Sequence, residues 1–143
     1  GGRAGPAGGG GSGPSAFDLA AEELAPYARR LAKRRAGDDP GELAEAWEAV
    51  AFQVQGFSDS LTAGQACSLL CSLSAGGVLQ EHAGARRSLL AALRRSEAGV
   101  LKPRRVVNLW IALDRADVAE GKEAAAFFRA ELPRALPAAA RAA

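Results

Sequence analysis

The chain has 143 residues, with 18 basic and 16 acidic side chains and a formal net charge of +2. A chain of this length is expected to form one domain with a core of its own. The sequence contains no run of 18 apolar residues, so it predicts no membrane-spanning helix. Cys67 and Cys71 are the only cysteines, which excludes a disulfide framework and favours a reducing compartment. Most of the basic residues are arginine. This bias suits phosphate or carboxylate partners, although the codon usage of a GC-rich genome also explains it.

Residues 1–14, GGRAGPAGGGGSGP, are a low-complexity segment that we expect to form an extended Gly-rich tail before a helical domain at 15–143. Such a composition buries too little apolar surface to offset the entropy cost of ordering it. The chain contains no Met, and the residues before Asp18 include Arg3 but no acidic side chain. A basic, acid-poor leader fits the end of an organellar targeting segment, although so much glycine is not typical of one.

The first predicted helix begins at Phe17, with Ser15 as a candidate N-cap, and ends at Gly37. Pro26 interrupts the apolar pattern and is expected to kink or divide this helix. The last turns are strongly basic, which suits the negative end of the helix dipole. The basic residues there are Arg29, Arg30, Lys33, Arg34 and Arg35.

The segment Asp39-Pro40-Gly41-Glu42 predicts the start of a second helix, because a capping residue is followed by proline at the first helical position. An apolar stripe with helical spacing follows and predicts the buried face. This stripe consists of Leu43, Ala46, Trp47, Val50, Ala51 and Val54. The acidic residues between these positions are expected on the solvated face.

A capping box at Thr62–Gln65 predicts a third helix that ends at Gly76-Gly77. A fourth helix is expected from about Leu79 to Glu97. Its apolar positions Ala85, Leu89 and Leu93 should face inward, while Arg87 and Arg94 should face outward.

Lys102-Pro103 predicts the start of a fifth helix, which contains the apolar stretch VVNLWIAL, and a sixth helix is expected at about 121–132. No segment alternates as a half-buried strand would. The sequence therefore predicts an all-α fold.

An internal repeat relates residues 61–78 to residues 101–118 at an offset of 40 positions without a gap. Leucine or valine occupies both members of the pairs Leu61/Leu101, Leu69/Leu109, Leu73/Leu113 and Val78/Val118. A period near 40 with two helices per unit is typical of stacked helical arrays. We therefore expect a short α-solenoid-like array of about three helical hairpins, with repeats at about 61–100 and 101–140 and a divergent first hairpin.

In such a stack the first helix of each unit packs on both neighbouring units, so its apolar surface should be buried on two sides. This explains why VVNLWIAL, at 106–113, is apolar on more than one face. The residues that we expect to pack the core are Leu43, Trp47, Val50, Leu69, Leu70, Leu73, Leu89, Leu109, Trp110 and Leu113.

The stretches TAGQACSLLCSL, at 62–73, and VVNLWIAL resemble the helical repeats of FAST-kinase-like and RAP-domain organellar proteins, which are related to octotricopeptide RNA-binding solenoids. The resemblance covers about residues 61–135. It implies an organellar protein that acts on RNA or is built around it. The chain departs from the family because it shows no RAP domain after the repeats and no Pro-rich octotricopeptide signature. These departures favour a small structural derivative over an independent, sequence-specific RNA binder.

The sequence presents no arrangement of residues that is typical of a catalytic or metal site. Cys67 and Cys71 share one side of a predicted helix, but with His82 they supply too few ligands for a structural zinc site. We interpret the two cysteines as small hydrophobic residues in a helix interface, and His82 as a residue at the boundary of the core. A non-catalytic protein without metal or cofactor is the expectation.

Arginine pairs are the remaining candidates for a functional role. The candidate RNA- or anion-contacting residues are Arg3, Arg29, Arg30, Arg34, Arg35, Arg87, Arg94, Arg104 and Arg105. Arg104 and Arg105 lie in the first turn of a predicted helix, where exposed N–H groups also attract an anion. Arg87 and Arg94 lie two turns apart on one face, as phosphate contacts would require. A solubilising rim on an Ala-rich protein explains the same pattern equally well.

The sequence therefore predicts a structural subunit of an organellar ribonucleoprotein, with a mitochondrial ribosome as the first candidate and a mitochondrion favoured over a plastid. The tail and the arginine pairs would contact rRNA, and the helical faces would contact neighbouring protein subunits. One alternative is a protein-only scaffold subunit of a respiratory, ATP synthase or photosynthetic complex. Another is a free organellar RNA-processing factor.

Overall fold

The computed structural model describes residues 19–34, 39–97, 99–117, 127–129 and 131. These residues form five helices and a short helical stretch at 127–129 and 131, and they contain no β-strand, so the all-α prediction is confirmed. The predicted tail, Arg3, the helix start at Ser15 and Phe17, and Arg35 lie outside the described residues. Among the described helices, none has both the length and the apolar character needed to cross a lipid bilayer.

Helix α1, Ala21–Ala32, begins where the Glu23 carboxylate accepts a hydrogen bond of 2.8 Å from the backbone N–H of its N-cap, Ala20. The predicted end at Gly37 is wrong, because the helix ends at Ala32 with Lys33 as its C-cap. The apolar face ends at this point, since Leu31 is the last buried residue of the helix.

Pro26 does not divide α1, which continues through it. A proline inside a helix removes one backbone hydrogen bond and costs about 3 kcal/mol. Leu24 and Leu31, on either side of the proline, are both buried. Full burial of a leucine side chain contributes about 1.5–3 kcal/mol, so the packing of this face offsets the cost of the proline.

Helix α2, Pro40–Gly56, has the predicted cap, since the Asp39 carboxylate accepts hydrogen bonds from the N–H groups of Gly41 at 3.0 Å and Glu42 at 3.2 Å. The predicted stripe faces inward: Trp47, Val50, Ala51 and Val54 are buried, while Leu43 and Ala46 are half-buried. The acidic residues Glu42, Glu45 and Glu48 are exposed, as expected.

Helix α3, Ala63–Ala75, lies at the centre of the molecule and contacts α1, α4 and α5. Its capping box is formed as predicted, with reciprocal hydrogen bonds of 2.9 and 3.1 Å between Thr62 and Gln65. It ends at Gly76, and Gly77 adopts a φ of +74°, a backbone conformation that favours glycine. Leu69, Leu70 and Leu73 are fully buried because α3 has neighbours on several sides.

Helix α4, Ala83–Arg95, begins later than the predicted Leu79. Leu79 is buried in the preceding connection, where its carbonyl accepts a hydrogen bond of 3.1 Å from the Arg86 guanidinium. The apolar run at 79 therefore anchors a loop rather than a helix. Within α4 the predicted faces are confirmed: Ala85, Leu89 and Leu93 are buried, and Arg87 and Arg94 are exposed.

Helix α5, Pro103–Arg115, buries only one face, formed by Val106, Leu109 and Leu113. The expectation that its apolar stretch is buried on two sides is wrong for Ile111, which is 43 % exposed. The reason is that, among the described helices, only α3 makes extensive contact with α5. Trp110 is half-buried and packs edge-to-face on Phe128 from the short helical stretch, with ring centroids 5.1 Å apart.

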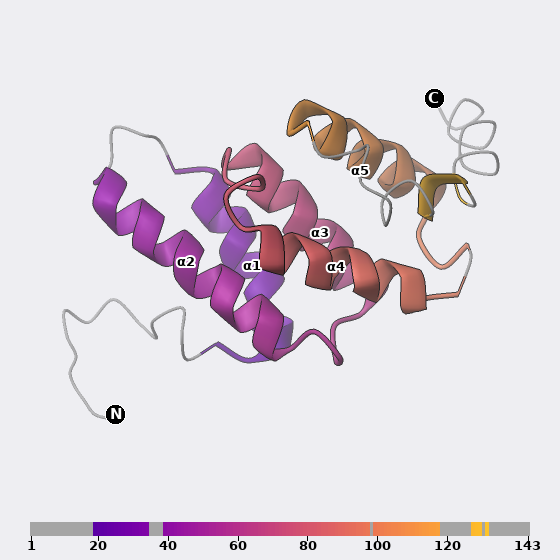
Figure 1. The fold of residues 1–143 in the computed structure, drawn as a ribbon, viewed down its shortest axis with the longest axis horizontal. Coiled ribbons are helices and arrows are strands. Elements are labelled where there is room, and N and C mark those ends of the chain that lie inside the picture. The colour runs from indigo at the N-terminus through magenta and orange to yellow at the C-terminus, as the bar shows by residue number, and fades with distance from the viewer. Residues whose placement is uncertain (1–18, 35–38, 98, 118–126, 130, 132–143) are drawn as a thin grey trace.

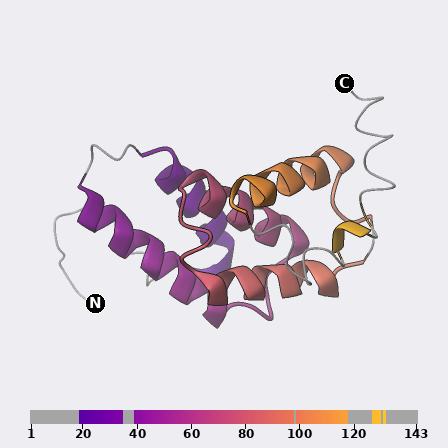
Figure 2. The ribbon, with the colours of Figure 1, turned by 45° about the horizontal axis from the view of Figure 1, so that its top comes forward.

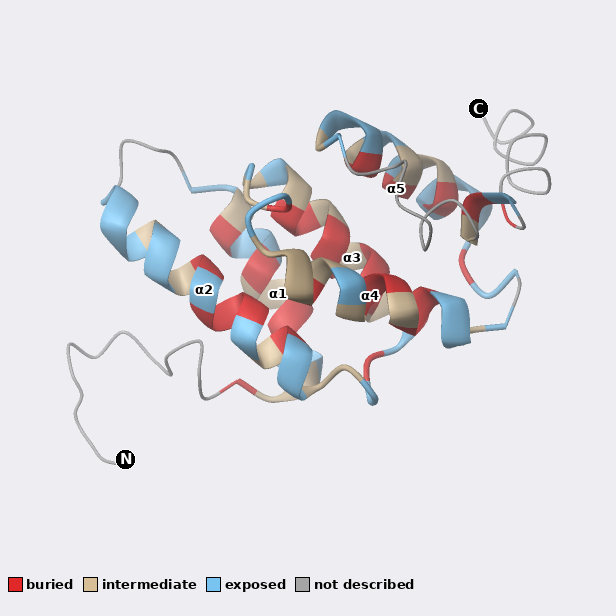
Figure 3. Cartoon of the chain, viewed as in Figure 1, coloured by how far each residue is buried: buried red, intermediate tan, exposed pale blue. Residues whose placement is uncertain are grey.

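Helices α1, α3 and α5 lie side by side in that order, while α2 contacts both α1 and α4 (Figures 1 and 2). In Figure 1, α2 and α4 lie in front of α1 and α3. Buried residues line the helix faces that point toward one another (Figure 3). Eight of the ten predicted core residues belong to this cluster, and the other two, Leu43 and Trp110, pack against it as half-buried side chains.

Polar contacts supplement the packing of α3 on α5. The Ser74 hydroxyl donates a hydrogen bond of 2.6 Å to the carbonyl of Ala112, and the Gln80 amide donates one to the carbonyl of Ala116. Helices α3 and α5 each contain 13 residues and begin 40 positions apart, at Ala63 and Pro103.

Candidate functional site

A groove with a volume of about 390 Å³ runs across the adjacent helices α1, α3 and α5. Among the described residues, no acidic side chain lines it. Its lining consists of Arg29, Ala32, Lys33, Cys67, Ser68, Cys71, Ser72, Ala75, Arg105 and Asn108. We call this surface the basic groove.

Three cations line the basic groove, and they come from two helices that are distant in sequence. Arg29 and Lys33 are exposed at the end of α1, and Arg105 is exposed in the first turn of α5. The Arg105 guanidinium is held in place, because it donates a hydrogen bond of 3.3 Å to the carbonyl of Gly64 at the start of α3. Among the described residues, no carboxylate forms an ion pair with Arg29, Lys33 or Arg105. The groove therefore has a positive potential that an anionic partner would neutralise.

Uncharged polar groups complete the wall of the groove between these cations. Ser68 on α3 and Asn108 on α5 occupy equivalent positions in the proposed repeat, 40 residues apart, and both line the groove. Ser72 is only 5 % exposed, and within the described part of the chain its hydroxyl has no side-chain hydrogen-bond partner. A buried hydroxyl without a partner is unfavourable, so a hydrogen-bond acceptor in the groove would stabilise it.

The two thiols form part of the same wall and interact with each other. The neighbouring Cys71 thiol, together with the nearby Arg105 guanidinium, lowers the pKa of Cys67 to about 7 despite burial. The neighbouring Cys67 and burial raise the pKa of Cys71. Cys67 Sγ also lies 3.9 Å from the carbonyl oxygen of Arg105. The prediction that the cysteines pack in a helix interface agrees with their burial, but they border a polar groove as well.

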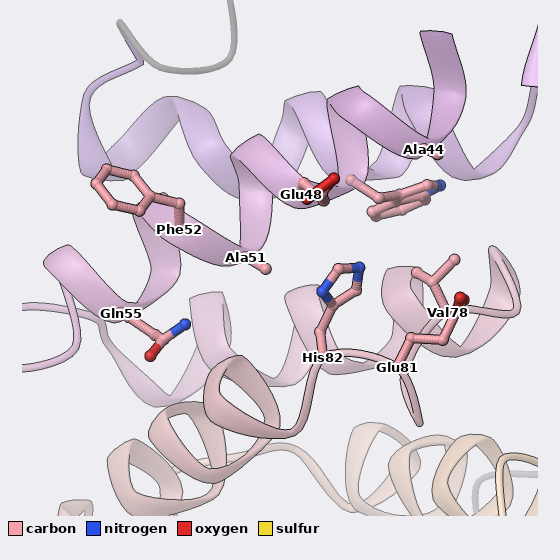
Figure 4. A pocket seen from close by; sticks show the side chains of 9 residues that line it. Ala44, Glu48, Ala51, Phe52, Gln55, Val78, Glu81 and His82 are labelled. Atoms are coloured by element: carbon pink, nitrogen blue, oxygen red, sulfur yellow. The ribbon is translucent and has the colours of Figure 1, made fainter. Parts of the chain in front are cut away.

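A second groove, with a volume of about 660 Å³, lies between α2 and the connection from α3 to α4. Figure 4 shows the His82 ring directed from that connection toward α2, with Glu48 on the opposite wall. Glu81 and Gln55 add further polar groups, and the described lining includes no Ser, Thr or Cys. Across the described residues, no three His, Cys, Asp or Glu side chains are grouped as metal ligands would be.

The structure brings together only part of the predicted set of arginines. Arg29 and Arg105 share the basic groove. Arg30 and Arg34 line a different groove on α1 beside Glu22 and Glu23. In that region Arg34 lies 3.6 Å from the Glu42 carboxylate.

The remaining predicted arginines lie on other surfaces of the protein or outside the described residues. Arg87 and Arg94 are exposed on α4, and Arg104 is exposed at the start of α5. Arg3 and Arg35 fall outside the described residues.

Sequence reasoning missed four residues of the basic groove: Lys33, Ser68, Ser72 and Asn108. The offset of 40 that pairs Ser68 with Asn108 was a usable signal, because equivalent repeat positions tend to lie on the same surface of a stack. Lys33 was recognised among the basic residues of the first helix but not as a candidate contact. Ser72 carries no comparable signal, since its place in the groove depends on how α1 packs on α3.

No family model, curated protein or solved structure matches this chain.

Proposed function

We propose that this protein is a non-catalytic structural subunit of an organellar ribonucleoprotein, with a mitochondrial ribosome as the first candidate, and that its basic groove contacts rRNA. The observation that carries this proposal is the convergence of Arg29, Lys33 and Arg105 in one groove whose described lining includes no acidic residue. A solubilising rim would scatter its charges over the surface and needs no shared groove.

The chemistry of the groove fits the phosphate backbone of RNA better than its bases. Arginine and lysine bind phosphate oxygens and release counterions, which gives affinity and position without reading sequence. Ser72 and Asn108 supply additional polar groups for phosphate or ribose oxygens. None of the described residues that line the groove is aromatic, so stacking of single-stranded bases is not part of this proposal.

We also propose that the helices form a short α-solenoid with a repeat of about 40 residues. Support comes from the side-by-side order of α1, α3 and α5, and from the contacts of α2 with α4. In this arrangement the basic groove crosses three successive units on one face of the array.

The second candidate function is that of a protein-only scaffold subunit in an organellar respiratory, ATP synthase or photosynthetic complex. The groove beside α2 favours it, because it combines an apolar wall with the carboxylates of Glu48 and Glu81. Phe52 on its rim is 66 % exposed. A neighbouring protein subunit that presents basic and apolar side chains would fit this groove, and such a contact also suits a ribonucleoprotein subunit.

The salt dependence of RNA binding tests the leading proposal. Fluorescence anisotropy with a labelled RNA hairpin, measured over a range of salt concentrations, would compare the unchanged chain with the variant Arg29→Gln/Lys33→Gln. Losing two phosphate contacts should reduce the magnitude of the slope of log affinity against log salt by about 1.4–1.8, the range between single-stranded and duplex nucleic acid. The variant Arg87→Gln/Arg94→Gln removes the same charge from α4 and should leave most of the affinity.

Two results would contradict the proposal. One is an unchanged chain that does not bind RNA even at low salt. The other is an equal loss of affinity in both double variants, because this would show that net charge matters and the groove does not.

A further inference from the structure

The only two cysteines of the chain lie one helical turn apart on α3 and face the basic groove. Cys67 is almost completely buried and Cys71 is half-buried, so the pair forms part of the floor and wall of the groove. The Cys67 thiol lies 3.9 Å from the carbonyl oxygen of Arg105, whose side chain lines the same groove. The proposed RNA contact uses the cations of the groove and gives these two sulfur atoms no role.

The positions of the thiols do not suit a disulfide bond. Residues four apart on a helix have Cβ atoms about 5–6 Å apart, whereas a disulfide requires a Cβ separation of about 3.5–4.5 Å. Oxidation to a disulfide would therefore distort α3, which is the central helix of the molecule. A single atom that bridges the two sulfurs from outside the helix avoids this distortion.

The surroundings of the thiols also exclude a zinc site built from the described residues. Structural zinc requires about four ligands, and no three potential ligands are grouped in the described part of the chain. Cu(I) is a soft cation that prefers thiolate ligands, and it is satisfied by two of them in a linear arrangement.

The cations of the groove offset negative charge at the pair, while the neighbouring Cys67 and burial raise the pKa of Cys71, so a metal ion has to displace the Cys71 proton. Arg105 lies close enough to lower the pKa of Cys67, and Arg29 and Lys33 line the same groove. A Cu(I) ion held by two thiolates has a net charge of −1, which these cations offset. The groove thus provides an environment in which an anionic metal–thiolate complex is stable.

We propose that Cys67 and Cys71 bind one Cu(I) ion as a bis-thiolate site at the floor of the basic groove. Binding breaks two S–H bonds and forms two Cu–S bonds. Both protons pass to the buffer, and neither copper nor sulfur changes its oxidation state. This site goes beyond the proposed contact with RNA and does not depend on it, because its ligands are the two sulfurs alone.

An anaerobic titration of the reduced full chain with Cu(I), in competition with a chromogenic Cu(I) chelator, tests the site. We expect one tightly bound Cu(I) per chain, an ultraviolet thiolate-to-copper charge-transfer band, and two sulfur neighbours in X-ray absorption spectra. Losing a residue that only hydrogen-bonds to a metal ligand weakens metal binding by up to about 100-fold. Replacing either cysteine, as Cys67→Ser or Cys71→Ser, removes a ligand itself and should therefore weaken Cu(I) binding by more than this. The variant Ser68→Ala changes the same wall without removing a sulfur and should bind as the unchanged chain does.

Three results would overturn the proposal. The first is that the unchanged chain competes for Cu(I) no better than the double variant Cys67→Ser/Cys71→Ser. The second is that either single variant keeps the full affinity. The third is a stoichiometry of one copper per two chains with dimer formation, which would place the metal between molecules. The ultraviolet and X-ray absorption spectra are measured on the unchanged chain. They therefore show whether copper is bound by two sulfur atoms even if a serine variant fails to fold.

Discussion

At the scale of single residues, Gly76 at the end of α3 has little room for a side chain, because it packs against Trp47 of α2. A Cβ atom at Gly76 would lie 2.5 Å from Cζ2 and 2.9 Å from Cε2 of the Trp47 ring. Trp47 is only 4 % exposed, so its ring has little room to move away. Gly76 is therefore required for close packing, whereas the backbone conformation that favours glycine at this helix end belongs to Gly77.

We predict that Gly76→Ala lowers the free energy of unfolding by about 1–3 kcal/mol, because overpacking a closed interface forces side chains out of their preferred rotamers. Gly56→Ala is the matched control, since nothing lies within 4 Å of a Cβ atom at that position. The control should be neutral or slightly stabilising. Urea unfolding followed by circular dichroism measures both, and equal stability of the two variants would contradict this account of Gly76.

The thiol pair predicts that stability depends on pH in the metal-free protein. The pKa of Cys67 is about 7 in the folded chain, compared with an ordinary value of 9.0 that we assign to the unfolded chain. Between these values the unfolded state binds more protons, so stability should rise with pH, by at most about 1.4 kcal/mol per unit. Above pH 9 the raised pKa of Cys71 reverses the trend.

Urea unfolding at pH 7, 8 and 9 measures this dependence, and Cys67→Ser should remove most of it. The groups that face Cys67 are the Cys71 thiol on its own helix and Arg105 on α5, while Arg29 and Lys33 approach from α1. If the stability curves of the unchanged chain and of Cys67→Ser run parallel with pH, then Cys67 is not ionised in the folded protein.

At the scale of helices, the two related helices α3 and α5 begin in different ways. Thr62 caps α3 through a reciprocal pair of hydrogen bonds with Gln65. The equivalent residue before α5 is Lys102, whose side chain makes no capping bond. Arg104 and Arg105 add positive charge to the first turn of α5, which the helix dipole disfavours.

We predict opposite effects of removing the N-cap of α3 and of introducing one at α5. Thr62→Ala should reduce stability by about 1 kcal/mol, and Lys102→Thr should raise it by about 0.5–1 kcal/mol, because threonine satisfies one of the free N–H groups of the helix. Thermal unfolding of both variants measures the difference. A destabilised Lys102→Thr variant would mean that the Lys102 side chain has a role that its exposed position does not reveal.

Local signals in the sequence predicted the helices well where a cap and an apolar stripe coincide. The caps at Asp39 and Thr62 are formed as expected, because these hydrogen bonds involve only neighbouring residues. The end of α1 and the start of α4 were predicted wrongly. At Leu79 an apolar residue anchors a loop through tertiary packing, and periodicity cannot distinguish this use from a helical one.

At the scale of the whole molecule, the basic groove depends on which helices lie side by side. Arg29 and Arg105 are far apart in sequence, and only the packing of α1 and α5 on α3 places them on one surface. The sequence identified both as candidates within a longer set of arginines. It could not separate them from Arg34, which lies beside Glu42, because pairing is decided by tertiary structure.

The central claim is that this chain belongs to a ribonucleoprotein and contacts its RNA through the basic groove. Sedimentation of the tagged full-length protein from a lysate of its own cells, with and without ribonuclease, tests this claim most directly. We predict that the protein sediments with a large RNA-containing particle, that ribonuclease releases it, and that Arg29→Gln/Lys33→Gln weakens the association more than Arg87→Gln/Arg94→Gln does. A large particle that contains the protein, lacks RNA and withstands ribonuclease would contradict the claim and identify a protein-only complex instead.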